Sequence, residues 1–319
     1  MSTSLLKTMS RGHRENTQSD SMKKTIRAFQ FVYTVLAIVA LSACGGGDDA
    51  ATPAASAPAA STPAAPVPAA STPSASTPPA AQVACRPSGS FTYSGSASQV
   101  AASNGQLAVV VVPTLPKANS KGRNMTAPNA PASSQIQQAS GAFTTLASSA
   151  AASDCLRIDD GGVVSEIQSV GTDVAIGRWN QAMDTDGNTY TMEQGVHYAV
   201  GTPLALAVKS GTLACTQLIA DKVANAVGGP SGTLNTSSAT LDLAAGTLDN
   251  LNLSMSLNGT PYTFSSTQTP LNGAATSGQL SVQSVVVGHD AAQPLIAVGY
   301  SATLPDTTGI GGVVVLSCK

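Results

Sequence analysis

The sequence predicts a mainly β protein whose principal domain is an antiparallel β-barrel of eight strands, with a β-sandwich as the alternative. The clearest strand lies at residues 250–257, where polar and apolar residues alternate strictly and so place every apolar side chain on one face. Asn258-Gly259 follows at once and accepts the positive φ values of a type I′ turn, so a hairpin returns the chain through Tyr262. Similar short strands recur at even spacing without helical patterns between them, as in a sandwich or a barrel.

The remaining elements follow from the same patterns. Further strands are expected at residues 91–93, 107–112, 241–243, 280–287, 296–301 and 313–316. One helix is expected within residues 133–150, because four apolar residues of this Ala-rich stretch fall near helical spacing and Ser133 or Ser134 can cap it: Ile136, Phe143, Leu146 and Ala150.

Residues 1–43 form a signal region. Lys23, Lys24 and Arg27 precede an uncharged apolar run at residues 28–41, and Leu41-Ser42-Ala43-Cys44 reads as a bacterial lipobox. The run is shorter than the ~20 apolar residues of a transmembrane helix. Cleavage before Cys44, acylation of Cys44 and membrane anchoring through the lipid are therefore expected, with Met22 as the true first residue. Gly45 rather than an aspartate follows the cysteine, which favours sorting to the outer membrane.

Residues 44–82 contain the lipidated cysteine and an uncharged tether rich in Ala, Pro, Ser and Thr. Such a segment has too few bulky apolar groups to offset the entropy of ordering, so it is expected to be disordered and extended. Residues 83–160 are expected to form a small mixed β/α subdomain, and residues 161–319 the barrel domain.

Charge and cysteine content restrict the partners and the compartment. The full chain carries a formal charge of −2, and no basic stripe exists, which argues against nucleic acid as a partner. The cysteines that follow Cys44 are even in number, which favours two disulfides in an exported protein. Of the three possible pairings, proximity along the chain favours the two between sequence neighbours: Cys85 with Cys155, and Cys215 with Cys318.

Turns and strand patterning between residues 162 and 316 resemble a known family. Residues 177–179 (Gly-Arg-Trp), 197–203 (His-Tyr-Ala-Val-Gly-Thr-Pro) and 258–263 (Asn-Gly-Thr-Pro-Tyr-Thr) occur in an order that is similar to lipoproteins with a transferrin-binding-protein-B-like β-barrel. The resemblance implies an eight-stranded barrel at or near the cell surface whose loops engage host or environmental proteins. It also implies that the strand at residues 312–317 pairs near the one at residues 172–178.

A partial calcium loop lies at residues 182–193. Asp184, Asp186 and Glu193 match three positions of an EF-hand loop, but Ala182 occupies the first position, where that loop needs a carboxylate. The same residues make a good hairpin loop, and turn chemistry alone accounts for them. The hairpin is the preferred interpretation, with calcium as the alternative.

Other chemical candidates are weaker. His197 and His289 are far apart in sequence and lack metal-ligand spacing, so each is expected to be a packed or solvated histidine. Neighbouring residues on a strand point to opposite faces, so His289 and Asp290 can cooperate only in a loop. Trp179 is expected in the core with a polar partner. Nucleophile and phosphate-binding motifs are missing.

The sequence therefore predicts an outer-membrane lipoprotein whose domain is a non-enzymatic binding or interaction module, facing either the periplasm or the cell exterior. No catalytic residue, cofactor or metal is assigned. The alternatives are a calcium-stabilised structural domain and an enzyme of unrecognised type.

Overall fold

The computed structural model describes residues 85–116, 122–207 and 210–319, all within one folding unit, Thr72–Lys319. Helical structure in these residues is confined to two short 3₁₀ turns, η2 (Ala132–Ser134) and η3 (Ala152–Asp154), which confirms the mainly β prediction. None of the described helices has the length and apolar character needed to cross a bilayer. The expected signal region, the expected lipidation at Cys44 and the expected tether fall outside the described residues.

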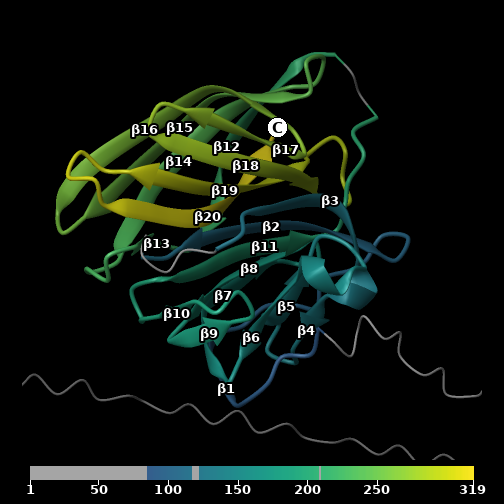
Figure 1. Ribbon diagram of the computed structural model, residues 1–319. Helices are drawn as coiled ribbons and strands as arrows, with labels where there is room; N and C mark the ends of the chain where they lie inside the picture. The colour runs from purple at the N-terminus through teal and green to yellow at the C-terminus, as the bar shows by residue number, and fades with distance from the viewer. Residues whose placement is uncertain (1–84, 117–121, 208–209) are drawn as a thin grey trace, which may run out of the picture. The chain divides into compact units, whose positions relative to one another are not determined.

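A six-stranded sheet forms the centre of the unit (Figure 1). Its order is β1-β7-β8-β11-β2-β3, and all neighbours are antiparallel except β1 and β7. Its strands are β1 (Phe91–Gly95), β2 (Gln106–Thr114), β3 (Met125–Pro131), β7 (Gly162–Val170), β8 (Val174–Asn180) and β11 (Gly195–Gly201).

A smaller sheet covers one face of the six-stranded sheet. Its order is β10-β9-β6-β5-β4, and its strands are β4 (Ile136–Gln137), β5 (Phe143–Ala147), β6 (Cys155–Asp159), β9 (Ala182–Asp184) and β10 (Thr189–Tyr190). Phe143 and Leu156 of this sheet pack with Trp179, Tyr198 and Val109 of the larger one in a single buried cluster. The Trp179 indole Nε1 donates to the Phe143 carbonyl at 2.7 Å. Trp179 is therefore a core residue with a polar partner, as predicted.

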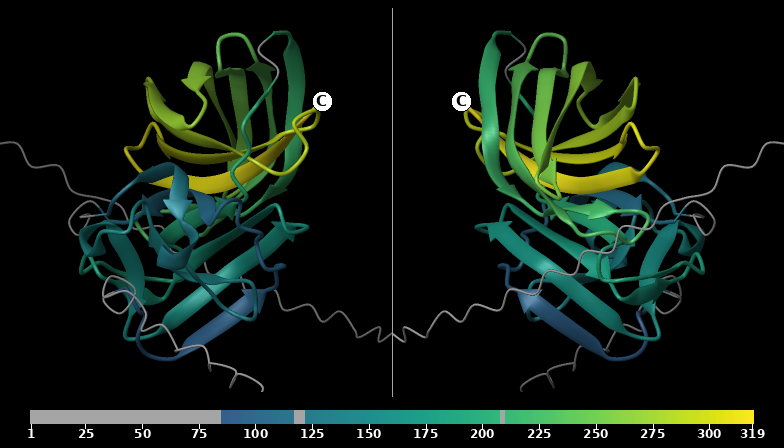
Figure 2. Two further views of the ribbon diagram at one scale, coloured as in Figure 1. Left: turned by 90° about the vertical axis from the view of Figure 1, so that its right-hand side faces the viewer. Right: turned by 90° about the vertical axis from the view of Figure 1, so that its left-hand side faces the viewer.

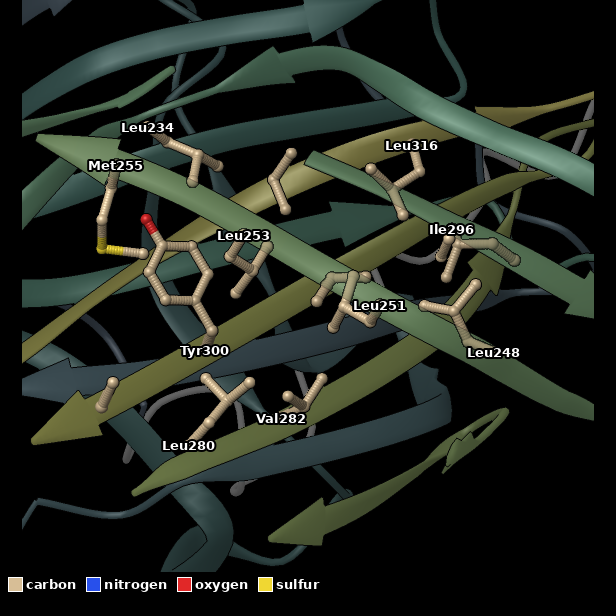
Figure 3. Close-up of a cluster of buried hydrophobic side chains, with 14 of the residues drawn as sticks. Leu234, Leu248, Leu251, Leu253, Met255, Leu280, Val282, Ile296, Tyr300 and Leu316 are labelled. Atoms are coloured by element: carbon tan, nitrogen blue, oxygen red, sulfur yellow. The ribbon is translucent and has the colours of Figure 1, made fainter. Parts of the chain in front are cut away.

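A nine-stranded sheet forms the C-terminal layer. Eight of its strands follow the order β16-β15-β14-β12-β20-β19-β18-β17, and β13 pairs with β14 and β20 beside this path. Its strands are β12 (Thr212–Ala220), β13 (Lys222–Asn225), β14 (Gly232–Asp242), β15 (Thr247–Leu257), β16 (Thr260–Pro270), β17 (Gly273–Ser277), β18 (Leu280–Val287), β19 (Leu295–Thr303) and β20 (Gly309–Cys318). The sheet curves around a leucine-rich core, and Figure 3 shows Leu251, Leu253, Ile296 and Tyr300 within it.

The outer face of the curved sheet packs on the six-stranded sheet, as Figure 2 shows from two sides. Val313 and Val315 of β20 meet Val110 of β2 and Ile176 of β8 in a second buried cluster. Gly299 permits this close approach, because a Cβ there would lie 2.5 Å from the Val112 side chain. Strands β19 and β20 are consequently buried on both faces, so apolar residues are nearly continuous along them.

The hairpin prediction is confirmed. Strands β15 and β16 pair with Met255 opposite Tyr262 and Leu257 opposite Thr260. Asn258 and Gly259 take φ values of 50° and 79°, as a type I′ turn requires. Strands β18, β19 and β20 also include the ranges expected for them, residues 280–287, 296–301 and 313–316.

Several other expectations are wrong. The helix expected within residues 133–150 is absent: η2, β4 and β5 occupy that stretch. All five β5 residues are buried, so both faces of the strand are covered. Polar and apolar residues therefore do not alternate along it, and the spacing of its apolar residues resembles that of a helix.

The expected pairing of the last strand with residues 172–178 is also wrong. Strand β20 pairs with β12, β13 and β19, whereas β8 pairs with β7 and β11. The two strands belong to different sheets and meet face to face through side chains such as Val313 and Ile176. Hydrophobic contact between layers, and not a shared ladder, brings these distant segments together.

The barrel does not close through backbone pairing in the described residues. No ladder joins β16 to β17 or β18 there, and side-chain bonds span the gap instead: Ser284 Oγ donates to the Pro270 carbonyl, and Val286 N donates to Asn272 Oδ1, both at 3.0 Å. The layered arrangement agrees with the sandwich alternative. The six-stranded sheet takes strands from both sides of residue 160, so the boundary expected there passes through one sheet.

Candidate functional site

A surface concavity lies where the β9–β10 hairpin and the segment that follows it meet the end of β6. We call it the loop hollow. Its volume is about 750 Å³. It is lined by Asp159, Asp160, Gly161, Gln181, Ala182, Met183, Thr189, Tyr190, Thr191, Met192 and Glu193. Its lining therefore combines acidic groups with methionine and tyrosine side chains.

A second hollow of about 310 Å³ adjoins the first and shares Met192 and Glu193 with it. Its other lining residues are Arg178, Lys222, Gly228, Pro230 and Ser231. Three large apolar side chains near these hollows are exposed, namely Met183 (38%), Met192 (52%) and Val227 (69%). Thioether side chains are flexible and polarisable, so they suit a surface that adapts to a partner.

The β9–β10 turn owes its shape to Asp184. The buried Asp184 Oδ1 accepts hydrogen bonds from the backbone N of Asp186 and Asn188 at 3.0 and 3.1 Å, and both carboxylate oxygens bond the Asn188 amide. Burial raises the pKa of Asp184, and the Asn188 bonds partly oppose that rise. The preferred hairpin interpretation of this segment is confirmed, since Met183 pairs with Thr189.

The other two carboxylates of the partial calcium loop have protein partners of their own. Asp186 Oδ2 accepts from Arg123 Nε at 2.9 Å, and Glu193 Oε2 accepts from the Thr191 hydroxyl at 2.9 Å. In the part of the chain that the structure describes, no three His, Cys, Asp or Glu residues gather as metal ligands would. The loop is thus organised by amides, a hydroxyl and an arginine.

Arg178 holds the segment that shapes both hollows. Its guanidinium is buried, and Nη1 donates to the carbonyls of Met192 and Gln194 at 3.1 and 3.2 Å. Nη2 donates to Glu166 Oε1 at 2.7 Å. Glu166 lies at a bulge in β7 with a φ of 58°, a conformation that non-glycine residues adopt at an energetic cost. The carboxylate of a residue with a strained backbone therefore holds the arginine, which in turn holds the Met192 carbonyl.

Two carboxylates in the same region link the two larger sheets, and each sheet layer contributes one of them. Glu166 of the six-stranded sheet accepts from the Lys222 backbone N at 2.7 Å. Asp221, which lies between β12 and β13, reaches back to His197 of β11, with 2.5 Å between Oδ2 and Nδ1. Asp221 Oδ1 also accepts from Val313 N at 2.8 Å. Each layer thus supplies one carboxylate to the other.

His197 and Asp221 are both completely buried. Burial raises the pKa of Asp221, and the His197 charge and hydrogen bond partly counter that effect. Among the described residues, none forms a hydrogen bond with His197 Nε2 or Tyr300 Oη. The negative charge of Asp221 adds to burial in raising the pKa of Tyr300. The pair could not reach a substrate from this position, because no part of either side chain contacts solvent.

His289 lies elsewhere and is solvent-exposed, within the expectation of a packed or solvated histidine. Its ring is exposed and Nδ1 lies 2.8 Å from Asp173 in the β7–β8 turn, whereas the neighbouring Asp290 bonds the Ala292 backbone N. The Asp173 hydrogen bond and charge raise the pKa of His289. The structure therefore brings neither histidine to the loop hollow.

Sequence reasoning missed the junction of Glu166, Arg178, His197 and Asp221. A signal was present: Arg178 and His197 each interrupt a strand that is otherwise apolar or small, and they lie opposite one another in the β8–β11 ladder. A charged residue at a buried strand position requires a partner. The sequence could not identify that partner, because Glu166 lies on β7 and Asp221 lies between β12 and β13, both distant along the chain.

No protein-family model matches this chain, and no curated protein matches it. Among solved structures, two mutants of Transferrin Binding Protein B from Haemophilus parasuis Hp5, described as a vaccine antigen, are similar to it. The double mutant is 8% identical, with a TM-score of 0.32, over 67% of this chain and 45% of that one. The single mutant is 8% identical, with a TM-score of 0.30, over 66% and 44%. The chain spans less than half the length of these proteins, and the likeness is distant.

Proposed function

We propose that this protein is an exported lipoprotein, anchored in the outer membrane through Cys44, whose β domain is a non-enzymatic module that binds a protein. The observation that carries the binding role is the group of exposed methionines, Met183 and Met192, at a hollow whose charged lining residues are acidic. The buried state of the His197–Asp221 pair supports a non-enzymatic role.

The chemistry of the loop hollow indicates what kind of partner it suits. Asp159, Asp160 and Glu193 are the charged residues of its lining, so a complementary surface carries lysine or arginine beside an apolar side chain. Arg178 holds the Met192 backbone in place before any partner arrives. Such preorganisation reduces the entropy that binding would otherwise cost.

The binding proposal is tested by affinity capture from host and environmental protein fractions with three forms of the full chain. These are the wild type, the M183A/M192A variant and a control, Leu218→Ala, which removes a similarly exposed apolar side chain (47%) on β12. We expect a protein that both wild type and control retain and that the methionine variant loses. Equal retention of every captured protein by all three forms would exclude the loop hollow as the binding surface.

The anchoring proposal rests on the lipobox and has its own test. Changing Cys44 to Ser removes the thiol that accepts the lipid, so fatty-acid labelling and membrane partitioning should both be lost. Persistence of labelled lipid on that variant would show that Cys44 is not the acylated residue. The two tests are independent, because one reads the anchor and the other reads the folded domain.

A further inference from the structure

Cys85, at the start of the described residues, and Cys155, the first residue of β6, lie together in a buried cluster. Cys85, Cys155 and Ala147 make up this cluster, and each cysteine is 5% exposed. The side chains of Cys85 and Cys155 are hydrogen-bonded to each other, and both are free thiols. Cys215 and Cys318 form a disulfide between β12 and β20, which leaves one of the three possible pairings open.

The backbone on both sides holds the two thiols in place. The Cys85 carbonyl accepts a hydrogen bond from Thr145 Oγ1 at 2.9 Å. Cys155 is fixed opposite Ala147 in the β5–β6 ladder, and its carbonyl accepts from Arg123 Nη2 at 2.8 Å. A disulfide needs two cysteine side chains that already lie close together, and the shared buried cluster places these two side chains together.

We propose that Cys85 and Cys155 are an oxidation site and that their disulfide fastens the N-terminal end of the folded domain to β6. In the reduced chain, the next backbone hydrogen bonds that hold the N-terminal end of the domain both involve Ser88. Ser88 N donates to the Ile158 carbonyl at 3.2 Å, and Gly161 N donates to the Ser88 carbonyl at 2.8 Å. The sequence places the tether directly before Cys85. The covalent bond would therefore carry any pull from the anchor into a buried strand.

The chemistry requires a disulfide-containing oxidant, such as oxidised glutathione or an oxidoreductase of an oxidising compartment. Two Sγ–H bonds and the S–S bond of the oxidant break, one Sγ–Sγ bond forms, and the two electrons and two protons end on the sulfurs of the oxidant, which becomes two thiols. The attacking species is a thiolate. Burial and the Cys85 hydrogen bond raise the pKa of Cys155, which disfavours the thiolate in the folded protein. We therefore expect the disulfide to form during folding, before the two cysteines are buried.

The pairing is tested on the purified full chain. The protein is reduced and unfolded, then refolded with oxidised glutathione, alkylated in denaturant without reductant and digested for mass spectrometry. We expect a cross-linked peptide that contains Cys85 and Cys155. Alkylation of both thiols, or a link from either one to another cysteine, would overturn the proposal. Because the oxidant is added to the purified protein in vitro, this result does not depend on export or lipidation of the protein.

The fastening role is tested by limited proteolysis of the oxidised protein. The C85S/C155S variant should be cleaved within residues 85–90 about tenfold faster or more, because a lost cross-link raises the population of the locally opened segment. The C215S/C318S variant is the control, and cleavage of residues 85–90 should be unchanged in it. Equal cleavage of wild type and C85S/C155S at these residues would show that the bond, even if present, does not fasten the segment.

Discussion

His197 of β11 and Asp221 of the nine-stranded layer lie 2.5 Å apart between Nδ1 and Oδ2, and neither side chain contacts solvent. This pair joins the two larger sheets within an otherwise apolar contact. It lies beside a second polar link between the layers, from Lys222 N to Glu166. A buried polar pair of this kind is costly to break, because the abandoned partner stays desolvated.

Asp221 should make stability depend on pH. Burial raises its pKa above the ordinary value of 3.8, so the folded chain binds this proton more tightly than the unfolded chain does. The stabilisation that results from this tighter proton binding is present below the ordinary pKa of Asp221. It is lost as the pH rises through the raised pKa of the folded protein. Denaturant unfolding between pH 3 and 8 should show this loss in the wild type and not in Asp221→Asn, which keeps the shape of the side chain. Parallel curves for the two proteins would contradict the assignment.

Removing the histidine alone should be strongly destabilising. His197→Ala leaves the Asp221 carboxylate buried without its partner, and breaking buried pairs in this way typically costs about 3–5 kcal/mol. Urea denaturation of the two single alanine variants and of H197A/D221A measures the coupling between the side chains. We expect the double variant to lose clearly less than the sum of the single losses. Additive losses would mean that the two side chains do not interact.

The β15–β16 turn provides a test of the backbone argument. A Cβ at Gly259 would contact no atom within 4 Å, so the cost of Gly259→Val comes from its φ of 79° alone. We expect a loss of about 1–2 kcal/mol in the free energy of unfolding. Asn258→Gly is the matched control, since glycine accepts the positive φ there, and it should be nearly neutral. A neutral Gly259→Val would show that the turn relaxes to another type.

Calcium should not stabilise the protein. Asp184 and Asp186 already bond Asn188 and Arg123, so an ion would have to displace those groups. A bound ion at ~100 times its Kd would add about 2.7 kcal/mol and raise the Tm by several degrees. Melting curves in excess calcium and in chelator should coincide. A higher Tm with calcium that Asp184→Asn abolishes would establish the calcium-stabilised alternative.

His289 should titrate above the ordinary histidine pKa of 6.5, because Asp173 accepts its hydrogen bond and supplies a negative charge. Its contribution to stability is present below that ordinary pKa and is lost as the pH rises through the raised value. NMR titration of the imidazole protons measures the shift directly. In Asp173→Asn the value should fall back toward 6.5, and an unchanged value would exclude Asp173 as the cause.

Local sequence patterns were sufficient to predict strands in which one face is buried and the other is exposed to solvent. The alternation at residues 250–257 and the Asn258-Gly259 turn determined β15, β16 and their register, because a slip by one residue would expose every leucine. The even number of cysteines after Cys44 predicted disulfides, and proximity along the chain favoured Cys215–Cys318, which the structure contains.

Only the tertiary structure decided what packs across layers. Strands β5 and β20 are buried on both faces, so their composition no longer shows which sheet they join or even that β5 is a strand. His197 lies on β11 and Asp221 between β12 and β13, and neither local sequence indicates the other residue as a partner. Their contact depends on how β12 and β20 lie over β11, and that placement results from the summed burial of the valine-rich interface, a non-directional force that leaves no short motif in the sequence.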